Sequence, residues 1–270
     1  MANIIPEIWA SQLTENLFAD NTFVARSINH SAFVNGSKVH VPNAGGKPTI
    51  TKNGTVFPAS ASKRTDIDVD YDIDIYRTEP IVVQNAEQVQ LSYDKLNSVI
   101  YNAKEALTEN ISLSVLGNWL AKCETQQTVL AAQFTRAKVL ELKKKFDEQD
   151  IPQNGRCIVL TPAAYSELLT DLQSAEQFAF SASANSQKGT IGTLFGFDFY
   201  MRSVIDTTEN NNTIGFAWYE GAVSRALGSI KIFNNPGVAQ YYGDLISAEV
   251  LAGGTAIRND KSGIFKIARQ

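Results

Sequence analysis

The feature that most constrains the fold is the run from Asp66 to Tyr76, in which aspartate alternates with an apolar residue. Successive side chains of a strand point to opposite faces. The run therefore predicts a strand with an acidic face and an apolar face, the latter formed by Ile67, Val69, Tyr71, Ile73 and Ile75. Upstream, Asn53-Gly54 is a strong hairpin turn signal. An isolated two-stranded hairpin is marginal in water, so this one must lie on another surface.

The acidic face is the one charge constellation in the sequence. Alternate residues of a strand lie about 6.6–7 Å apart, whereas a calcium ion holds its ligands at about 2.3–2.6 Å. One strand therefore cannot enclose an ion with these aspartates alone. A solvated or partner-facing acidic face is favoured, and it also discourages unwanted edge-to-edge pairing. A cation bridge between subunits is the alternative.

Two amphipathic helices are predicted after this hairpin, over 91–122 and about 133–149. The first would be about 42 Å long at 1.5 Å per residue, which is long for a globular helix. The run Lys143-Lys144-Lys145 lies near the end of the second helix, where cations suit the helix dipole. A solvated helix end is the favoured interpretation of this run, and a phosphate or nucleic-acid contact is the alternative.

A separate α/β unit is predicted over 150–225, and a strand-rich segment follows it. The unit is expected to contain these elements: a buried strand 156–160, a helix 163–172 opened by Pro162, a loop 181–189, a strand 190–200 and a strand 213–219. In 226–270 the expected strands are 229–233, 245–251, 255–258 and 264–268. Gly253-Gly254 and Asn259-Asp260 are expected to separate strands there.

Composition narrows the possible functions. Only 19% of the 270 residues are charged, and the net charge is −4, which argues against a dedicated nucleic-acid reader. Cys123 and Cys157 form no disulfide framework and are expected to be buried thiols, with a disulfide between them as the alternative. No secretory signal and no uninterrupted apolar span is found, so folding in the cytoplasm and no membrane association are expected.

The sequence offers little for catalysis. His30 and His40 are the only histidines, and both precede the α/β unit in which a nucleophile would be expected. No zinc-ligand spacing, phosphate-binding glycine loop or other cofactor motif is present. We therefore predict that the protein is not an enzyme and has no cofactor and no metal site. A chain without a visible site, but with elements that cannot bury themselves, fits an assembly subunit.

Several segments resemble those of tailed-phage major capsid proteins. The opening Ile4-Ile5-Pro6-Glu7-Ile8-Trp9-Ala10 is similar to their N-terminal arm. The run from Asn154 to Leu169 resembles the family's turn, Gly-Arg, strand, Thr-Pro, Tyr and Leu-Leu pattern. The stretch from Gly192 to Tyr200 resembles its Gly-Phe strand, and the run from Gly243 to Ile264 resembles its C-terminal segment. Together these segments cover nearly the whole chain.

The resemblance implies an α+β fold, the tailed-phage and herpesvirus capsid fold. Its parts are placed here as follows: an N-terminal arm at 1–37, an extended two-stranded E-loop at 38–80, a peripheral domain with a long spine helix at 81–149, an axial α/β domain at 150–225, and a return to the peripheral domain at 226–270.

The function implied is that of a major capsid protein that assembles through hexamers and pentamers into an icosahedral shell around double-stranded DNA. Its expected partners are copies of itself, a separate scaffolding protein, a portal, decoration proteins, and DNA bound without sequence specificity. The expected location is the virion capsid, assembled in the cytoplasm of the bacterial host. An encapsulin-type nanocompartment shell and a tail or other virion structural protein are the alternatives. Crosslinking of a lysine to an asparagine occurs in some relatives, but no acceptor or catalytic glutamate is identified in this sequence.

The arm and the E-loop are the segments expected to contact neighbouring subunits, because neither can bury its apolar residues alone. The candidate contact residues are Ile5, Trp9, Ile67, Asp68, Val69, Asp70, Tyr71, Asp72 and Ile73.

Overall fold

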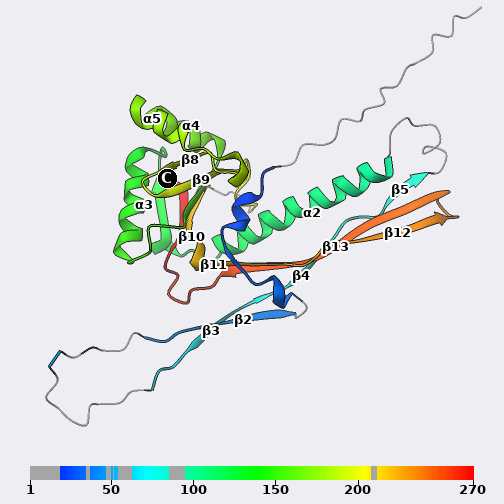
Figure 1. Cartoon of the computed structure of the whole chain (residues 1–270), viewed down its shortest axis with the longest axis horizontal. Coiled ribbons are helices and arrows are strands. Elements are labelled where there is room, and N and C mark those ends of the chain that lie inside the picture. The colour runs from blue at the N-terminus through cyan, green and yellow to red at the C-terminus, as the bar shows by residue number, and fades with distance from the viewer. Residues whose placement is uncertain are drawn as a thin grey trace, which may run out of the picture.

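The computed structural model describes residues 19–34, 37–46, 50, 52–53, 63–84, 95–207 and 212–270. In this part of the chain, two mixed sheets lie beside each other and a two-stranded hairpin extends away from them (Figure 1). The predicted mixed helix-and-sheet class is confirmed.

The first sheet is long and narrow, and it is organised around β13 (Gly243–Ala256). On one side β13 pairs with β11 (Val223–Leu227) and β12 (Lys231–Val238), and on the other side with β4 (Asp74–Arg77) and β5 (Ile81–Gln84). The short β1 (Ile28–Asn29) adds to β11 in parallel.

A long helix, α2 (Lys95–Leu120), runs along one face of this sheet (Figure 1). Its apolar residues recur at helical spacing, and those of its C-terminal part are buried. Leu107, Ile111 and Val115 share one core with Val250 and Ala252 of β13. The predicted long helix is confirmed from Lys95 to Leu120; it ends two residues before the predicted 122, and 91–94 lie outside the described residues.

The second sheet has the strand order β6-β14-β10-β7-β9-β8. Its strands are β6 (Thr128–Ala131), β7 (Arg156–Leu160), β8 (Gly192–Leu194), β9 (Phe197–Met201), β10 (Thr213–Tyr219) and β14 (Ile264–Arg269). The helices of this unit are α3 (Arg136–Glu148), α4 (Pro162–Asp171) and α5 (Ser174–Ala182). Thr161 caps α4, and Pro162 occupies its first turn, as expected for that residue.

The core of the second sheet is rich in aromatic rings. Phe146 of α3 contacts Phe197 and Phe265, with ring centroids 5.2 and 5.1 Å apart. Every residue of β7 is buried, which is typical of a strand covered on both faces. The predicted strands at 156–160 and 213–219 are confirmed with the same bounds.

Two predicted elements of this unit are wrong in detail. The single strand expected over 190–200 is a hairpin, β8 and β9, because Phe195 and Gly196 both adopt positive φ and form a two-residue turn. The loop expected over 181–189 begins inside α5 and contains a short 3-10 helix, Ser186–Lys188.

The predicted break between two strands at Gly253 and Gly254 is wrong. Both glycines lie within the continuous β13. A Cβ atom on Gly253 would lie 2.5 Å from the Asp72 carbonyl oxygen, and one on Gly254 would lie 2.7 Å from the Ser224 carbonyl oxygen. Gly253 therefore permits close approach of the backbone at Asp72, which lies outside this sheet, and Gly254 permits close approach of the neighbouring β11 within it.

The sheets group the chain differently from the predicted domain boundaries. Strand β6 and helix α3 precede residue 150 but belong to the second sheet and its core. Strand β11 begins at Val223, inside the predicted axial domain, but belongs to the first sheet, and β14 follows 226 but lies in the second. The chain therefore crosses between the two sheets more often than the boundaries imply.

The hairpin consists of β2 (Lys38–Asn43) and β3 (Ile67–Asp72), paired antiparallel. The run predicted as one strand from Asp66 to Tyr76 changes partner at Ile73, from β2 to β13. Gly54 lies outside the described residues, so the predicted turn at the tip stays a prediction.

Candidate assembly surfaces

The acidic face of the hairpin has basic partners on its own strand pair. Lys38 Nζ lies 2.7 Å from Asp70 Oδ2 and 3.5 Å from Asp72 Oδ1. His40 Nδ1 lies 3.0 Å from Asp68 Oδ2. The hydrogen bond and charge of Lys38 hold the pKa of the Asp70 carboxyl below its usual value. The alternation thus places all these carboxylates on one exposed face.

The apolar face of the same strand is only partly covered. Tyr71 and Ile73 are buried in a small core with Val34, Val39 and Ala226. Ile67 and Ile75 are 50% and 54% exposed, although both belong to the same alternation.

The predicted contact residues therefore fall into three groups. Ile5 and Trp9 lie outside the described residues. Asp68, Asp70 and Asp72 line the exposed acidic face, and Ile67 is exposed on the other face with Val69 half-buried beside it. Tyr71 and Ile73 are packed within their own chain. For all three groups, contact with a neighbouring subunit stays a prediction.

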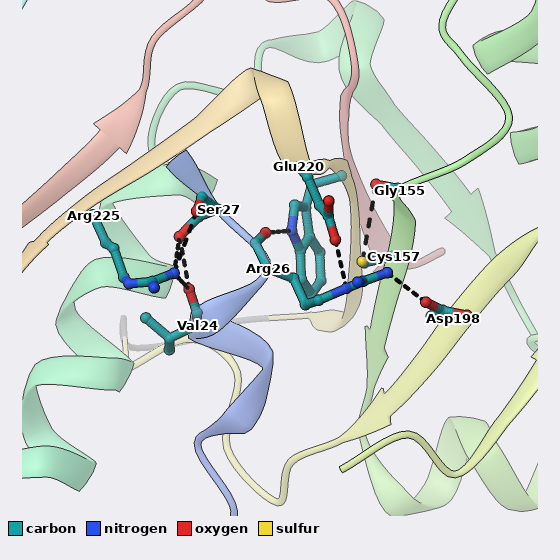
Figure 2. Close-up of polar contacts among 9 residues, drawn as sticks. Val24, Arg26, Ser27, Gly155, Cys157, Asp198, Glu220 and Arg225 are labelled. Carbon is teal, nitrogen blue, oxygen red and sulfur yellow. Dashed lines mark hydrogen bonds and ion pairs between the residues drawn. The ribbon is translucent and has the colours of Figure 1, made fainter. Parts of the chain in front are cut away.

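A salt-bridged anchor at Arg26 joins the N-terminal segment to the rest of the molecule (Figure 2). The guanidinium of Arg26 lies 2.5 Å from Asp198 of β9 and 2.6 Å from Glu220, which directly follows β10. Trp218 Nε1 donates a hydrogen bond of 2.8 Å to the Arg26 carbonyl oxygen. The segment is thereby held against the second sheet.

Arg225 holds the same segment from the first sheet (Figure 2). Its guanidinium donates to the Val24 carbonyl oxygen at 2.6 Å and to Ser27 Oγ at 3.0 Å. The segment therefore bridges the two sheets through two arginines. Sequence reasoning missed this anchor, because neither arginine belongs to a motif or to a charge run.

The two cysteines are free thiols. Burial raises the pKa of both Cys123 and Cys157 to about 12. Such thiols stay protonated near neutral pH and are poor nucleophiles. The interpretation of the pair as thiols rather than a disulfide is confirmed.

The lysine run of α3 is engaged within its own chain. Lys143 and Lys144 pair with Asp147 and Glu148 at 3.1 and 3.7 Å. Lys145 lies over the ring of Phe265, 5.7 Å from its centroid. These contacts suit a solvated helix end.

Neither a metal-binding group nor a membrane helix is found among the described residues. No cluster of three or more histidine, cysteine, aspartate or glutamate side chains is placed there to hold a metal ion. No helix in that part of the chain combines the length and apolarity needed to cross a bilayer.

The two sheets, the long helix and the projecting hairpin define the fold of phage capsid proteins, as solved structures show. The chain superposes on a structure from Mycobacterium phage Che8 with a TM-score of 0.73 and 18% identity, covering 98% of this chain and 97% of that one. The capsid of cyanophage P-SCSP1u gives a TM-score of 0.76 at 13% identity, covering 99% and 94%. The capsid of cyanophage Pam1 gives 0.74 at 11%, covering 99% and 97%.

The sequence itself identifies the family. Residues 90–268 match the model of the phage capsid protein family, and the chain belongs to that family. It is thus a structural protein of the virion capsid rather than an enzyme, as predicted. No significant match is found among curated protein sequences.

Proposed function

We propose that this major capsid protein assembles through hexamers and pentamers into an icosahedral shell that encloses the double-stranded DNA of a tailed bacteriophage. The observation that carries the proposal is the contrast between two well-filled cores and a hairpin whose outer apolar residues are uncovered. A monomer leaves this surface in water, whereas a shell offers a neighbour to cover it.

In this proposal each part of the fold corresponds to one domain of a capsid subunit. The second sheet with its helices acts as the axial domain around each capsomer's centre, and the first sheet with α2 acts as the peripheral domain. The β2–β3 hairpin is the E-loop, and the residues before it form the N-terminal arm. The sheet membership of β6, β11 and β14 replaces the sequence-derived boundaries in this assignment.

In the proposed contact, the exposed apolar residues of the hairpin lie on an adjacent subunit near its α2. Ile67 and Val69 are the described residues best placed for it, with Ile5 and Trp9 of the arm as further candidates. Asp68 and Asp72 retain exposed carboxylate surface while paired to His40 and Lys38. They can therefore meet basic groups of the neighbour at the same time.

The other proposed partners are those that a DNA-filled shell requires. A scaffolding protein, a portal and decoration proteins are proposed as partners, and the DNA is held without sequence-specific contacts. The mildly acidic chain suits enclosure rather than tight binding of DNA. Assembly is proposed to occur in the cytoplasm of the bacterial host.

Negative-stain electron microscopy and light scattering of the purified full-length chain test this function. Closed shells, or capsomers of five and six copies, are the expected result. Open tubes would favour a tail protein instead. A chain that stays monomeric at every concentration and salt condition would contradict the proposal.

A further inference from the structure

Two aromatic residues of the described chain adopt a left-handed backbone conformation, and packing explains only one of them. Phe195 has a φ of 51° and Tyr242 a φ of 52°. Bulky side chains seldom adopt this conformation, which suits glycine or asparagine. Phe195 packs against the core of the second sheet, and the Arg136 guanidinium lies 5.3 Å from its ring centroid. Contacts within the chain therefore account for Phe195.

Tyr242 gains no such contacts from its own chain. It is 81% exposed, and its neighbour Tyr241 is 44% exposed. Among the described residues, none hydrogen bonds to the Tyr242 hydroxyl or stacks on its ring. Both tyrosines lie in the turn between β12 and β13, residues 239–242, which we name the tyrosine tip. The tip lies at one end of the molecule, away from the second sheet (Figure 1). A strained residue that its own chain does not need points to a function outside the chain.

The surface around the tyrosine tip carries no charged side chain. Residues 232–243 contain no lysine, arginine, aspartate or glutamate, although β12 is mostly exposed. The next charged residue, Asp244, accepts a hydrogen bond of 3.0 Å from the Gly237 amide. Without cations the tip cannot neutralise phosphates, so it does not suit the DNA backbone. Exposed tyrosines without neighbouring charges are instead typical of the centre of a protein–protein contact.

The absence of charge favours a second copy of the chain as the partner. Identical surfaces repel each other when both carry the same charge, whereas the uncharged tip can meet its own copy without this cost. A buried tyrosine covers about 150–250 Å², so two tips together would bury about 600–1,000 Å². Stable interfaces bury at least about 1,200 Å². The contact therefore adds to other contacts within an assembly and does not by itself hold two free subunits together.

We infer that the tyrosine tip is a self-contact site, at which the tips of neighbouring copies pack Tyr241 and Tyr242 against one another. The inference rests on the proposed function, because the copies must be held together by other contacts as well. The left-handed conformation of Tyr242 is then retained for assembly and not for folding.

A Tyr242→Asn variant of the full-length chain separates these two roles. Asparagine tolerates a positive φ, so the unassembled variant should unfold at the wild-type temperature or slightly above it. Its assembled particles should dissociate at a lower temperature than wild-type particles, as followed by light scattering. Tyr242→Phe is the matched control, since it keeps the ring, and its particles should retain more stability than those of Tyr242→Asn.

A Gln240→Cys variant tests whether the tips of two copies meet. Gln240 is exposed within the tip, and both tyrosines are kept. Under mild oxidation, assembled particles of this variant should give disulfide-linked pairs of subunits. Wild-type particles should give none, because Cys157 is buried and Cys123 is partly buried. The unassembled variant should give far fewer pairs than its particles.

Three results would each overturn the inference: Tyr242→Asn particles as stable as the wild type, an unassembled Tyr242→Asn chain that unfolds below the wild type, or assembled Gln240→Cys particles without linked pairs. A wild-type chain that never assembles would contradict the proposed function and the inference with it. Failure of the inference alone is thus recognised by normal assembly of the wild type.

Discussion

The second sheet and the β2–β3 hairpin differ in what covers their strands. In the second sheet, α3 and α4 cover the strands, and Phe146 and Phe265 lie ring against ring in the core. In the hairpin, Tyr71 is buried but Ile67 of the same face is half-exposed. The difference lies in the layer that the chain itself supplies over each set of strands. The body folds on its own contacts, whereas we propose that the hairpin is completed by a neighbour.

The comparison predicts the largest loss of stability for changes in the body. Phe146→Ala should lower the free energy of unfolding of the subunit by about 3–5 kcal/mol, because it opens a cavity in a fully packed core. Chemical denaturation of the unassembled chain measures the effect. Phe178→Ala is the control, since this ring is 77% exposed. Equal losses for the two variants would contradict the assignment of the core.

A somewhat smaller loss of stability is expected when Arg156 is replaced. This side chain is buried between Phe146 and Phe197. It donates to the Ile151 and Pro152 carbonyl oxygens at 2.6 and 2.9 Å. Arg156→Met keeps much of the volume but leaves these acceptors without a donor, which should cost roughly 1–3 kcal/mol. Chemical denaturation measures this change in the free energy of unfolding. A variant as stable as the wild type would contradict the prediction and show that water replaces the guanidinium.

Acid should weaken the body through Glu167. Hydrogen bonding to Arg269 and to the Phe134 amide holds the pKa of Glu167 below its ordinary 4.5. The unfolded chain therefore binds the proton more readily, so this contribution is present above pH 4.5 and is lost as the pH falls below it. Thermal unfolding should show Glu167→Gln to be less stable than the wild type at pH 7, with the difference shrinking toward pH 4. A difference that is constant with pH would exclude the ion pair as its cause.

The smallest effect on folding is expected for the acidic face of the hairpin. Replacing Asp68, Asp70 and Asp72 with asparagine should leave subunit stability nearly unchanged, because these pairs are exposed and screened by water. The thermal stability of assembled shells should nevertheless fall.

Lys38→Gln is the matched control for that triple variant, since it removes the basic partner within the hairpin and leaves the carboxylates. If the acidic face meets a neighbour, the control shells keep more stability than the triple variant. Triple-variant shells that survive heating like the wild type would contradict a role for this face in assembly.

The sequence predicted the elements whose pattern is local. Continuous apolar character defined β7, and the helical repeat defined α2. It failed where a distant backbone decided the outcome, because glycine at 253 permits the approach of Asp72 rather than ending a strand.

For the surfaces, too, the local patterns were predictable and the contacts between distant residues were not. The alternation of β3 could be read directly from the sequence, and its two faces are found as expected. It could not show that Val34 and Ala226 would cover the middle of the apolar face, or that Arg26 would pair with Asp198 and Glu220. Those contacts join residues far apart in the chain and leave no local periodicity.

The central claim is that the outer apolar face of the hairpin serves a neighbour rather than its own chain. The most direct test is electron microscopy of the Ile67→Asp variant beside the wild type, with thermal unfolding of both unassembled proteins. We predict an unchanged unfolding temperature and a loss of closed shells. Normal shells from this variant, or loss of subunit folding itself, would contradict the claim.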